Sequence, residues 1–410
     1  MKNTFLSEFE NRGYFHQCTN LSELNNLIEK KKIRGYIGFD CTAPSLHVGS
    51  LLQIMCLRLL QKHGHQPVVL LGGGTTQIGD PSGKDETRKI LTEKKIFENS
   101  NKIKLILKKF LKSDNFKTRP VYVDNKIWLS KLNYINFLRD IGKYFTINKM
   151  LTFDSVKLRL EREQSLSYIE FNYMILQAYD FLELFRSKDC CLQIGGSDQW
   201  GNIVNGVDLI KRYLGKKSFG LTTPLITTSS GSKMGKTESG AIWLDKNLLS
   251  PYEYWQFWRN TDDKDVIKFL KLFTDLSLDK IDNIKNENIN KLKILLANQA
   301  TSMLHGEKEA NKSEETARLT FEKREIGIGL PKYMIEKSEI EKGINILEII
   351  IKSGLLNSKS EARRAINNNG IKINNITIKN EKLIINTKSF ENNLCKVSFG
   401  KKKHIIIQLI

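Results

Sequence analysis

Two short apolar runs with a dense helical segment between them open the organised part of the chain. Tyr36 to Phe39 and Pro67 to Leu71 are almost entirely apolar, a pattern typical of buried parallel strands. Between them, Leu51 to His63 has the apolar density of a buried helix, and Gly64 follows it as a C-cap. Strand, helix and strand in this order predict a right-handed βαβ unit.

The same pattern returns further along the chain. Leu192 to Ile194 predict a second short strand, glycines follow it, and Ile203 to Leu214 predict a helix. In both halves a carboxylate stands where the strand ends, Asp40 in the first and Asp198 in the second. Such an acid is the usual partner of a ribose hydroxyl in doubly wound folds. We therefore expect an α/β catalytic domain with a Rossmann-like parallel sheet over residues 1–247.

The turn that leads from the first strand into its helix suits a phosphate group. His47 to Ser50 pass through Gly49 into the helix, whose free N–H groups and positive end attract anions. Gly49 lets a phosphate approach the backbone, and His47 can donate a hydrogen bond to it. An ordinary capped helix start has the same sequence, so these four residues alone do not decide between the two interpretations.

Two glycine-rich loops carry further cations. Neither possible P-loop frame fits the first of them, Gly79 to Lys84. Gly74 and Gly79 have the P-loop spacing, but Asp80 and not lysine follows Gly79. Lys84 does follow Gly83, but no glycine stands five residues before Gly83. This segment is a loop with one acid, and its cations Lys84 and Arg88 suit transient phosphate contacts as well as a plain surface.

The second of these loops, Ser230 to Thr237, places Lys233 and Lys236 three residues apart. Its glycines make it too flexible for the core, and its lysines suit a neighbouring phosphate.

A helix predicted over residues 154–187 carries an unusual polar face. Tyr173, Gln177 and Asp180 are spaced i, i+4 and i+7, so a phenol, an amide and a carboxylate share one side. They could form the solvent face, but nearly all of their neighbours are apolar, which indicates a helix buried all round. Because buried polar groups need partners, we expect a ligand-binding face.

The remaining segments divide into an insertion and three C-terminal parts. Residues 89–150 have helical patterns and predict an insertion between the two halves of the sheet. Residues 248–325 predict a helical domain, with helix starts at Thr261 to Asp263 and Ser313 to Glu315. Glycines and a proline mark a linker over 326–341.

Residues 342–410 predict a small α+β module of their own. Within it, Ser358 and Glu361 have the spacing of a capping box, Gly370 suits the end of that helix, and Asn374-Asn375 suit a tight turn between strands.

Composition narrows the class of protein. The chain has 65 Lys and Arg against 45 Asp and Glu, a net charge of +20, which favours a polyanionic partner even though Lys, Asn and Ile are frequent throughout. The six cysteines show no C-x-x-C spacing, as expected for a reduced, cytoplasmic protein without structural zinc. No apolar run has membrane-spanning length, so we expect no membrane partner.

Taken together, these motifs resemble the class I aminoacyl-tRNA synthetases, specifically the bacterial-type tyrosyl-tRNA synthetases. His47 to Ser50 is similar to the family's HIGH element and Lys233 to Thr237 to its KMSKS loop. The blocks GFDCTAPSLHVGSL, IGDPSGKDETR, EFNYMILQAYD and LQIGGSDQWGNI match the family in order and spacing. The resemblance extends over essentially the whole chain, and the ordered combination is far more specific than any one motif.

The resemblance implies roles for individual residues. For L-tyrosine, Tyr36 and Asp180 would bind the phenolic hydroxyl, Tyr173, Gln177 and Asp80 the ammonium group, and Gln199 the carboxylate side. For ATP and the adenylate, the implied residues are Gly38, Asp40, His47, Gly49, Ser50, Gly196, Asp198 and Lys236. For phosphate transfer, Thr42 and His47 would hold the γ-phosphate end, and Lys84, Arg88, Lys233, Lys236 and Thr237 the departing pyrophosphate.

The family reaction needs no protein nucleophile, because the carboxylate of tyrosine attacks the α-phosphorus of ATP. Positioning and charge neutralisation do the work, with cations, helix ends and the Mg²⁺ carried by ATP. The ribose hydroxyl of tRNA(Tyr) then takes the tyrosyl group. The resemblance also implies a homodimer and a C-terminal RNA-binding domain in which Lys359, Arg363 and Arg364 meet tRNA phosphates.

Two positions depart from the family pattern, and two other functions stay open. Ser50 stands in place of the last histidine of the first motif, and Cys41 where many relatives have proline, which leaves the affinity for ATP open. As a helix N-cap and hydroxyl donor, Ser50 would reach the ribose or adenine end of ATP less strongly than a histidine.

The first alternative function is a tryptophanyl-tRNA synthetase, which would not need the pair Tyr36 and Asp180. A catalytically silent RNA-binding protein would not need the intact lysines and His47.

Overall fold

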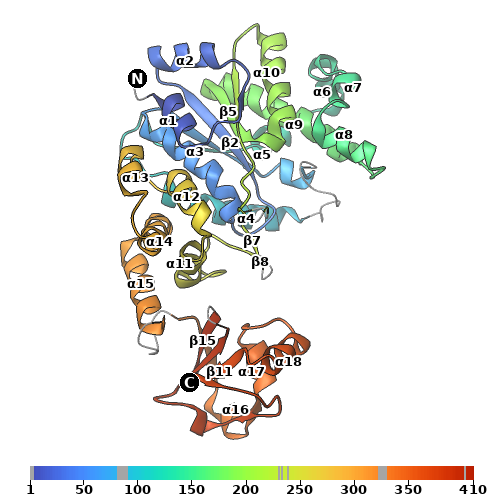
Figure 1. The fold of residues 1–410 in the computed structure, drawn as a ribbon. Helices are drawn as coiled ribbons and strands as arrows, with labels where there is room; N and C mark the ends of the chain where they lie inside the picture. Colours follow the sequence, from blue (N-terminus) through green and yellow to red (C-terminus); the bar gives the residue numbers. More distant parts are fainter. Residues whose placement is uncertain are drawn as a thin grey trace. The chain divides into compact units, whose positions relative to one another are not determined.

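The computed structural model describes residues 4–80, 91–229, 231, 234–237, 240–321, 330–400 and 403–410. The chain forms two compact units. The larger unit comprises Met1–Leu249 and Asn260–Leu304, and the C-terminal unit comprises Ser250–Arg259 and His305–Ile410. Figure 1 shows the fold of both units.

A six-stranded sheet forms the centre of the larger unit. Its strands follow the order β1 (Gln17–Cys18), β6 (Phe219–Thr223), β5 (Cys190–Gly196), β2 (Arg34–Asp40), β3 (Gln66–Gly72) and β4 (Val121–Asp124). All neighbouring pairs are parallel except β1 with β6. The connections run outward in opposite directions from the β2–β5 pair, so this pair is the topological switch point, where such folds bind ligands. The expected Rossmann-like parallel sheet is confirmed.

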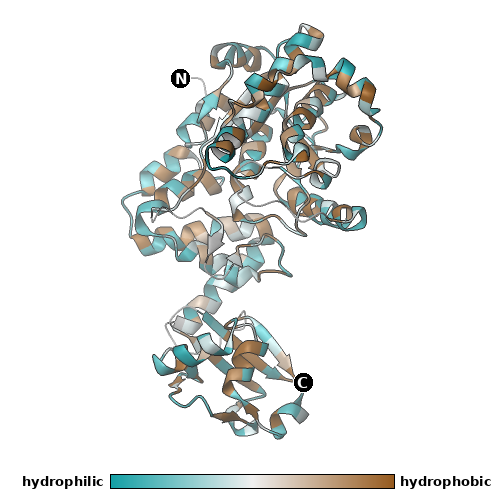
Figure 2. Cartoon of the chain, turned by 90° about the vertical axis from the view of Figure 1, so that its right-hand side faces the viewer, coloured by the Kyte–Doolittle hydropathy of each residue, from teal (hydrophilic) through white to brown (hydrophobic). Residues whose placement is uncertain are grey.

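Helices cover both faces of this sheet. Figure 1 shows α3 on one side of β2 and β5, and α9 and α10 on the other. The helices of the larger unit are α1 (Phe5–Asn11), α2 (Leu21–Lys30), α3 (Leu51–Lys62), α4 (Glu93–Phe110), α5 (Lys126–Leu129), α6 (Tyr134–Asp140), α7 (Ile147–Met150), α8 (Asp154–Glu161), α9 (Tyr168–Lys188), α10 (Trp200–Leu214), α12 (Val266–Phe273), α13 (Leu278–Ile284) and α14 (Ile289–His305). Teal and brown residues alternate along many of them in Figure 2, as expected for helices with one buried side.

Both βαβ predictions hold, with small shifts in the bounds. The first unit is β2–α3–β3, and Gly64 follows α3 with φ +80°, as a C-cap requires. The second is β5–α10–β6, and Gly215 ends α10 with φ +64°. The all-helical interpretation of residues 89–150 was wrong, because Val121–Asp124 form β4, which pairs with β3. A strand of four residues is too short to show a clear period in the sequence.

The helix predicted over 154–187 is two helices, α8 and α9. Ser167 begins α9 with a capping box, in which its hydroxyl accepts the N–H of Glu170 and its own N–H donates to the Glu170 carboxylate. Arg159 of α8 donates to the same carboxylate at 3.1 Å. The buried carboxylate of Glu170 therefore connects α8 to the start of α9.

The C-terminal unit contains a five-stranded sheet with helices. The strand order is β12 (Ile376–Thr377), β11 (Ile371–Ile373), β14 (Leu394–Phe399), β15 (Lys403–Leu409) and β9 (Lys332–Ile335). The helices are α11 (Pro251–Arg259), α15 (Glu307–Phe321), α16 (Lys337–Glu341), α17 (Ile346–Lys352) and α18 (Lys359–Asn367). A separate pair joins β10 (Ile344–Asn345) to β13 (Ile384–Ile385).

The structure corrects two predicted boundaries. Residues 332–341 are not linker, because β9 pairs with β15 and α16 follows it. The predicted helical domain 248–325 is divided, since α11 and α15 group with the C-terminal unit and α12 to α14 with the larger one. No helix starts at Ser313, which lies inside α15 and donates its hydroxyl to the Glu309 carbonyl.

Local predictions in the C-terminal module are partly right. Asn374 and Asn375 form the turn between β11 and β12 with φ of +44° and +69°. Ser358 caps α18, but the Glu361 carboxylate accepts from the N–H of Asn357 rather than Ser358, so the capping box is incomplete. The left-handed residue after α18 is Asn369, with φ +55°, not Gly370.

Candidate active site

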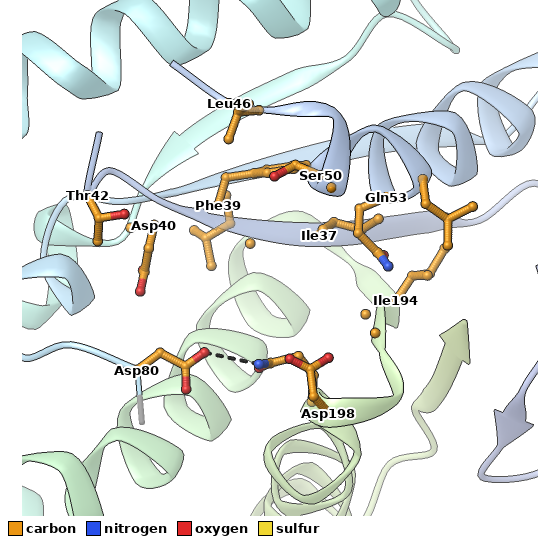
Figure 3. A pocket seen from close by; sticks show the side chains of 18 of the residues that line it. Ile37, Phe39, Asp40, Thr42, Leu46, Ser50, Gln53, Asp80, Ile194 and Asp198 are labelled. Carbon is orange, nitrogen blue, oxygen red and sulfur yellow. Dashed lines mark hydrogen bonds between the residues drawn. The ribbon is translucent and has the colours of Figure 1, made fainter. Parts of the chain in front are cut away.

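A pocket of about 630 Å³ opens at the carboxyl ends of β2 and β5. Its walls come from the turn before α3, the polar face of α9, the loop after β5 and the segment after β6 (Figure 3). The two glycine-bordered strand ends therefore meet in one cavity, as a switch point predicts.

The pocket collects nearly all predicted site residues that the structure describes in the larger unit. Its lining includes Tyr36, Gly38, Asp40, Thr42, His47, Gly49, Ser50, Asp80, Tyr173, Gln177, Asp180, Gly196, Asp198 and Gln199. Lys84, Arg88 and Lys233 lie outside the described residues. The backbone of Lys236 and Thr237 forms β7, which pairs with β8 (Gly240–Ala241), and their side chains are outside the description.

Asp180 is the most deeply buried carboxylate of the pocket, with 2% of its surface exposed. The Asn125 amide donates to it at 2.9 Å and the Trp128 indole N–H at 2.7 Å. Burial raises the pKa of Asp180 to about 7, against the two hydrogen bonds, which favour the ionised form. Two fixed donors thus orient a carboxylate that still has lone pairs for a ligand.

Tyr36 presents a hydroxyl to the same end of the pocket. Its side chain is 1% exposed and its ring packs against Phe181 at 5.3 Å. Among the residues that the structure describes, its hydroxyl has no hydrogen-bond partner. Burial, with the charge of Asp180 second, raises the pKa of Tyr36 well above its ordinary value, so the hydroxyl stays protonated. A buried hydroxyl without a partner costs free energy unless a ligand supplies one.

A second acid is held at the strand end, as the sequence predicted. Asp40 closes β2, accepts the Thr75 hydroxyl at 2.9 Å and accepts the Tyr173 hydroxyl at 3.1 Å. Burial, with Asp40 as the next cause, raises the pKa of Tyr173 well above its ordinary value. Tyr173 therefore remains a donor, and it joins the polar face of α9 to the end of β2.

A chain of amides links the third acid to α9. Gln199 donates to Asp80 at 3.0 Å, and Asn202 donates to Gln199 at 3.1 Å and to Gln177 at 3.0 Å. Asn202 fixes the orientation of both glutamine side chains, since its amide donates to the oxygen of each. Their NH₂ groups then point away from it, and that of Gln199 reaches Asp80.

The turn before α3 is tightly built. The Gly49 N–H donates to His47 Nδ1 at 2.9 Å, so this tautomer of His47 carries its proton on Nε2. A Cβ on Gly49 would lie 2.5 Å from the His47 ring and 3.1 Å from the Met234 carbonyl, which leaves room for glycine alone. Gly235 has φ +91°, and a Cβ on it would lie 2.6 Å from the Gly49 nitrogen. The two glycine-rich motifs, far apart in sequence, are thus in contact.

The two departures from the family pattern are both visible. Ser50 precedes α3 but makes no side-chain capping bond, so its expected role as a helix cap is wrong. Cys41 is fully buried, and its backbone is held by the Thr76 hydroxyl at 2.7 Å and by the Asn99 amide at 2.9 Å. These two bonds fix the loop where a proline would otherwise stiffen it.

Sequence reasoning missed the residues that hold the acids in place. Asn125 and Trp128 orient Asp180, Thr75 orients Asp40, and Asn202 orients the two glutamines. Asn125 directly follows β4, and a polar residue at the end of a strand is a signal for a site residue. The sequence did not predict β4, so this signal could not be used for Asn125. Asn202 lies within the block LQIGGSDQWGNI, but no local pattern there indicates its role.

The predicted tRNA-binding residues lie in the C-terminal unit. Lys359, Arg363 and Arg364 are exposed on α18, and Arg363 lies 3.6 Å from the Glu381 carboxylate. In the described part of the chain, no helix is long and apolar enough to cross a membrane. Over the same residues, no group of three or more His, Cys, Asp or Glu side chains could hold a metal ion.

Comparison with known families matches almost the whole chain. Residues 29–322 match the model of the class I tRNA synthetases for tryptophan and tyrosine, and residues 323–407 match the C-terminal domain of tyrosine–tRNA ligases. The chain belongs to the class I tRNA synthetases. A tyrosine–tRNA ligase of Pelagibacter ubique is 66% identical to this synthetase over the full length of both chains. One from Rickettsia africae is 52% identical over 99% of this chain and all of its own.

Solved structures agree with the family. A C-terminally truncated mitochondrial tyrosyl-tRNA synthetase of Aspergillus nidulans matches with a TM-score of 0.71 and 32% identity, covering 78% of this synthetase and 95% of its own chain. A tyrosyl-tRNA synthetase of Archaeoglobus fulgidus, complexed with L-tyrosine, is 18% identical with a TM-score of 0.56 over 75% of this chain and 99% of its own. At that identity the second match shows the fold alone.

Proposed function

We propose that this class I synthetase is a tyrosine–tRNA ligase. It activates tyrosine with ATP to tyrosyl-adenylate and pyrophosphate, and then transfers tyrosine to the 3′-terminal ribose of tRNA(Tyr). The observation that carries the proposal is the pairing of Tyr36, whose buried hydroxyl lacks a described partner, with Asp180, whose carboxylate is fixed by two donors. A phenolic hydroxyl gives the Tyr36 hydroxyl a partner and donates to the remaining lone pairs of Asp180, whereas phenylalanine would leave the Tyr36 hydroxyl unpaired and would add nothing to the two hydrogen bonds of Asp180.

The rest of the tyrosine is held by the polar face of α9 and its neighbours. Asp80, Tyr173 and Gln177 bind the ammonium group, since the acid supplies charge and the phenol and amide supply oxygen acceptors. Gln199 lies on the carboxylate side. The amide chain through Asn202 supports this assignment, because it orients these acceptors before the ligand arrives.

ATP occupies the other end of the pocket. Asp40 and Asp198 bind the adenylate ribose, and Gly38 and Gly196 allow its close approach. Thr42 and His47 hold the γ-phosphate end, with Gly49 and Ser50 at the helix start. Lys84, Arg88, Lys233, Lys236 and Thr237 neutralise the pyrophosphate, and Mg²⁺ arrives with ATP. The contact between Gly235 and Gly49 supports a common phosphate site for the two motifs.

These groups need only bind and orient the reactants. The tyrosine carboxylate attacks the α-phosphorus, the bond to the bridging oxygen breaks, and pyrophosphate leaves with the electron pair. Cations and backbone N–H groups stabilise charge on the phosphates in the transition state. No proton transfer to a protein side chain is required in this step.

We also propose that tRNA binding uses the C-terminal unit, through Lys359, Arg363 and Arg364, and that the enzyme acts in the cytoplasm. All six cysteines are unpaired, which is compatible with a reducing compartment. The exposure of the three cations on one short helix supports phosphate contacts, which fix orientation without reading sequence.

We further propose a homodimer that associates through α5 to the start of α9. Nine of the twenty exposed large apolar side chains in the described chain fall within residues 127–169, which favours an interface there. Figure 1 shows α6, α7 and α8 gathered on one side of the larger unit. The surface residues are Ile127, Tyr134, Ile135, Leu138, Ile147, Leu151, Leu160, Tyr168 and Ile169.

The test is amino-acid-dependent exchange of labelled pyrophosphate into ATP, run with each of the twenty amino acids. Tyrosine alone should support fast exchange, and phenylalanine should be slower by orders of magnitude. Faster exchange with tryptophan than with tyrosine, or none with any amino acid, would contradict the proposal.

A further inference from the structure

A second cavity, of about 410 Å³, opens at the amino ends of β5 and β6. Its volume is within the range of about 300–1,000 Å³ that is typical of small-molecule sites. Cys191 near the start of β5 lines this cavity, whereas Gly196 at the end of β5 lines the active-site pocket. At about 3.3 Å per residue, these two positions are roughly 16 Å apart. Figure 1 shows α2, which forms one wall of the second cavity, at the top of the larger unit and away from β7 and β8.

The floor of the second cavity is apolar. Phe219 at the start of β6 is 4% exposed, and Cys191 is 9% exposed. Leu27 of α2 and Phe185 of α9 lie around them and are half-buried. Two aromatic rings and a leucine therefore offer an apolar surface that water reaches only from the open side.

The pairing of β5 with β2 is irregular at the residue that contributes a thiol to this floor. Arg34 pairs with Cys190, and the next residue of β2 pairs with Leu192. Cys191 is therefore skipped in the pairing, and irregularities of this kind turn a side chain away from its regular direction. Cys190 and Leu192 are fully buried and do not line the second cavity, whereas Cys191 does.

The rim of the second cavity has one more positive than negative charge. Three lysines and two acids line it, namely Lys30, Lys31, Lys217, Glu23 and Asp189. Lys217 is paired with Glu23 at 2.9 Å, whereas Lys30 and Lys31 have no ion-pair partner in the described part of the chain. Because the lysines are exposed, a ligand can reach their ammonium groups from water. A single negative charge on a ligand would neutralise the rim.

From these features we infer that the second cavity binds a small monocarboxylate with an apolar body, such as a medium-chain fatty acid. The apolar body covers Leu27, Phe185 and Phe219, and the carboxylate accepts hydrogen bonds from Lys30 or Lys31. A neutral ligand would leave the excess charge uncompensated, and a cationic ligand would add to it. No step of the proposed reaction uses this cavity, so the inference is independent of the proposed function.

The test is isothermal titration calorimetry of the full chain with octanoate, with butyrate, octylammonium and octan-1-ol for comparison. Octanoate should bind at least about 10-fold more tightly than butyrate, because four more CH₂ groups leave water. It should also bind at least about 10-fold more tightly than octylammonium, because the charge of the ligand is reversed. Lys31→Gln should weaken octanoate about 2- to 5-fold, the range for an exposed ion pair, and leave octan-1-ol unchanged.

A chemical probe locates the bound ligand. Octanoate should slow the alkylation of Cys191 by N-ethylmaleimide, followed at this residue by mass spectrometry, because the ligand covers the thiol. Binding without protection of Cys191 would place the ligand elsewhere and overturn the inference.

A matched pair of variants lies on α2. Leu27→Glu places a charge in the apolar wall and should weaken octanoate at least about 10-fold. Leu21 is 42% exposed on the same helix and does not line the cavity, so Leu21→Glu should leave the affinity within about twofold. Circular dichroism should show the wild-type fold in both variants. No binding of octanoate, equal affinities for octanoate and octylammonium, or equal effects of the two variants would overturn the inference. None of these measurements uses tyrosine or ATP, so failure here is distinct from failure of the proposed function.

Discussion

Asp180 shows how a single side chain acquires its function from its surroundings. A carboxylate on a helix ordinarily faces water, but this one is 2% exposed and accepts hydrogen bonds from Asn125 and Trp128. Burial disfavours its charge, the two donors favour it, and the balance leaves a pKa of about 7. Its charge state therefore changes near neutral pH.

The first prediction concerns the Asp180→Asn variant. The asparagine amide has the shape of the carboxylate, but its NH₂ group would face one of the two donors, Asn125 or Trp128. Its neutral oxygen would also accept a weaker hydrogen bond from the phenol of tyrosine. We expect kcat/KM for tyrosine in the exchange reaction to fall about 10- to 100-fold, the range for a hydrogen bond to a charged group. The preference for tyrosine over phenylalanine should shrink by the same factor, and the KM for ATP should change little. An unchanged preference would remove Asp180 from the recognition of tyrosine.

The second prediction concerns pH. Since the ionised carboxylate is the better acceptor for the phenol, kcat/KM for tyrosine should rise with pH up to about 7 and level off above it. Stability should move in the opposite direction. The raised pKa means that the folded state holds the proton between about pH 4 and about 7, so the contribution of Asp180 to stability is lost over this window as pH rises. Asp180→Asn should abolish both trends, measured as the pH profile of kcat/KM and as the melting temperature relative to wild type.

At the scale of elements, the sequence predicted the two βαβ units and the polar face of α9, because both depend on strong local periodicity. It missed β4, a four-residue strand between polar segments, and with it the position of Asn125. It also joined α8 and α9, since the capping box at Ser167 interrupts a pattern that is otherwise helical on both sides. Short elements take their structure from pairing, which a local pattern does not contain.

The third prediction tests the turn that joins β2 to α3. In Gly49→Ala, the added methyl group would overlap the His47 ring and displace the Met234 carbonyl of the second glycine-rich loop. Overpacking of about 1–3 kcal/mol should lower kcat/KM for ATP about 10- to 100-fold. The KM for tyrosine should change little, because Asp180 and Tyr36 lie at the other end of the pocket.

Gly142→Ala is the matched control for this turn. Its nearest neighbour would lie 3.7 Å from the new methyl group, and its backbone is not left-handed, so exchange activity should stay at the wild-type rate. Equal activity of Gly49→Ala and Gly142→Ala would show that the close approach of Gly49 to Met234 has no part in catalysis.

At the scale of the whole molecule, two compact units divide the proposed tasks. All lining residues of the pocket belong to the larger unit, and α18 belongs to the C-terminal unit.

The fourth prediction separates the two activities. A chain ending at Phe321 should retain tyrosine-dependent pyrophosphate exchange within about threefold and lose aminoacylation of tRNA(Tyr). In the full chain, Arg363→Ala with Arg364→Ala should raise the KM for tRNA, with a weaker dependence of binding on salt, because each cation releases about one counterion. Equal loss of exchange and aminoacylation in the truncated chain would contradict the division.

The fifth prediction concerns association. Ile135 is 67% exposed within the proposed dimer surface, and Leu105 is 61% exposed on α4, outside it. A buried charge without a partner destabilises an interface. Ile135→Glu should therefore shift the wild-type dimer toward monomer in analytical ultracentrifugation, whereas Leu105→Glu should leave the dimer intact. A monomeric wild type, or equal effects of both variants, would remove this surface as the interface.

The sequence by itself determined the type of sheet, the order of its main units and many of the polar and glycine residues that line the pocket. The sheet and its units follow from periodicity and from glycines and acids at strand ends, whereas most of the site residues follow from the resemblance of short motifs to the family, and both signals are local. Tertiary structure alone decided which groups hold Asp180, Asp40 and Cys41, that Met234 and Gly235 contact Gly49, and which side chains meet in the cavity at the amino ends of β5 and β6. Such facts depend on residues that are distant along the chain and adjacent in space, and no local pattern encodes which distant donor reaches which acceptor.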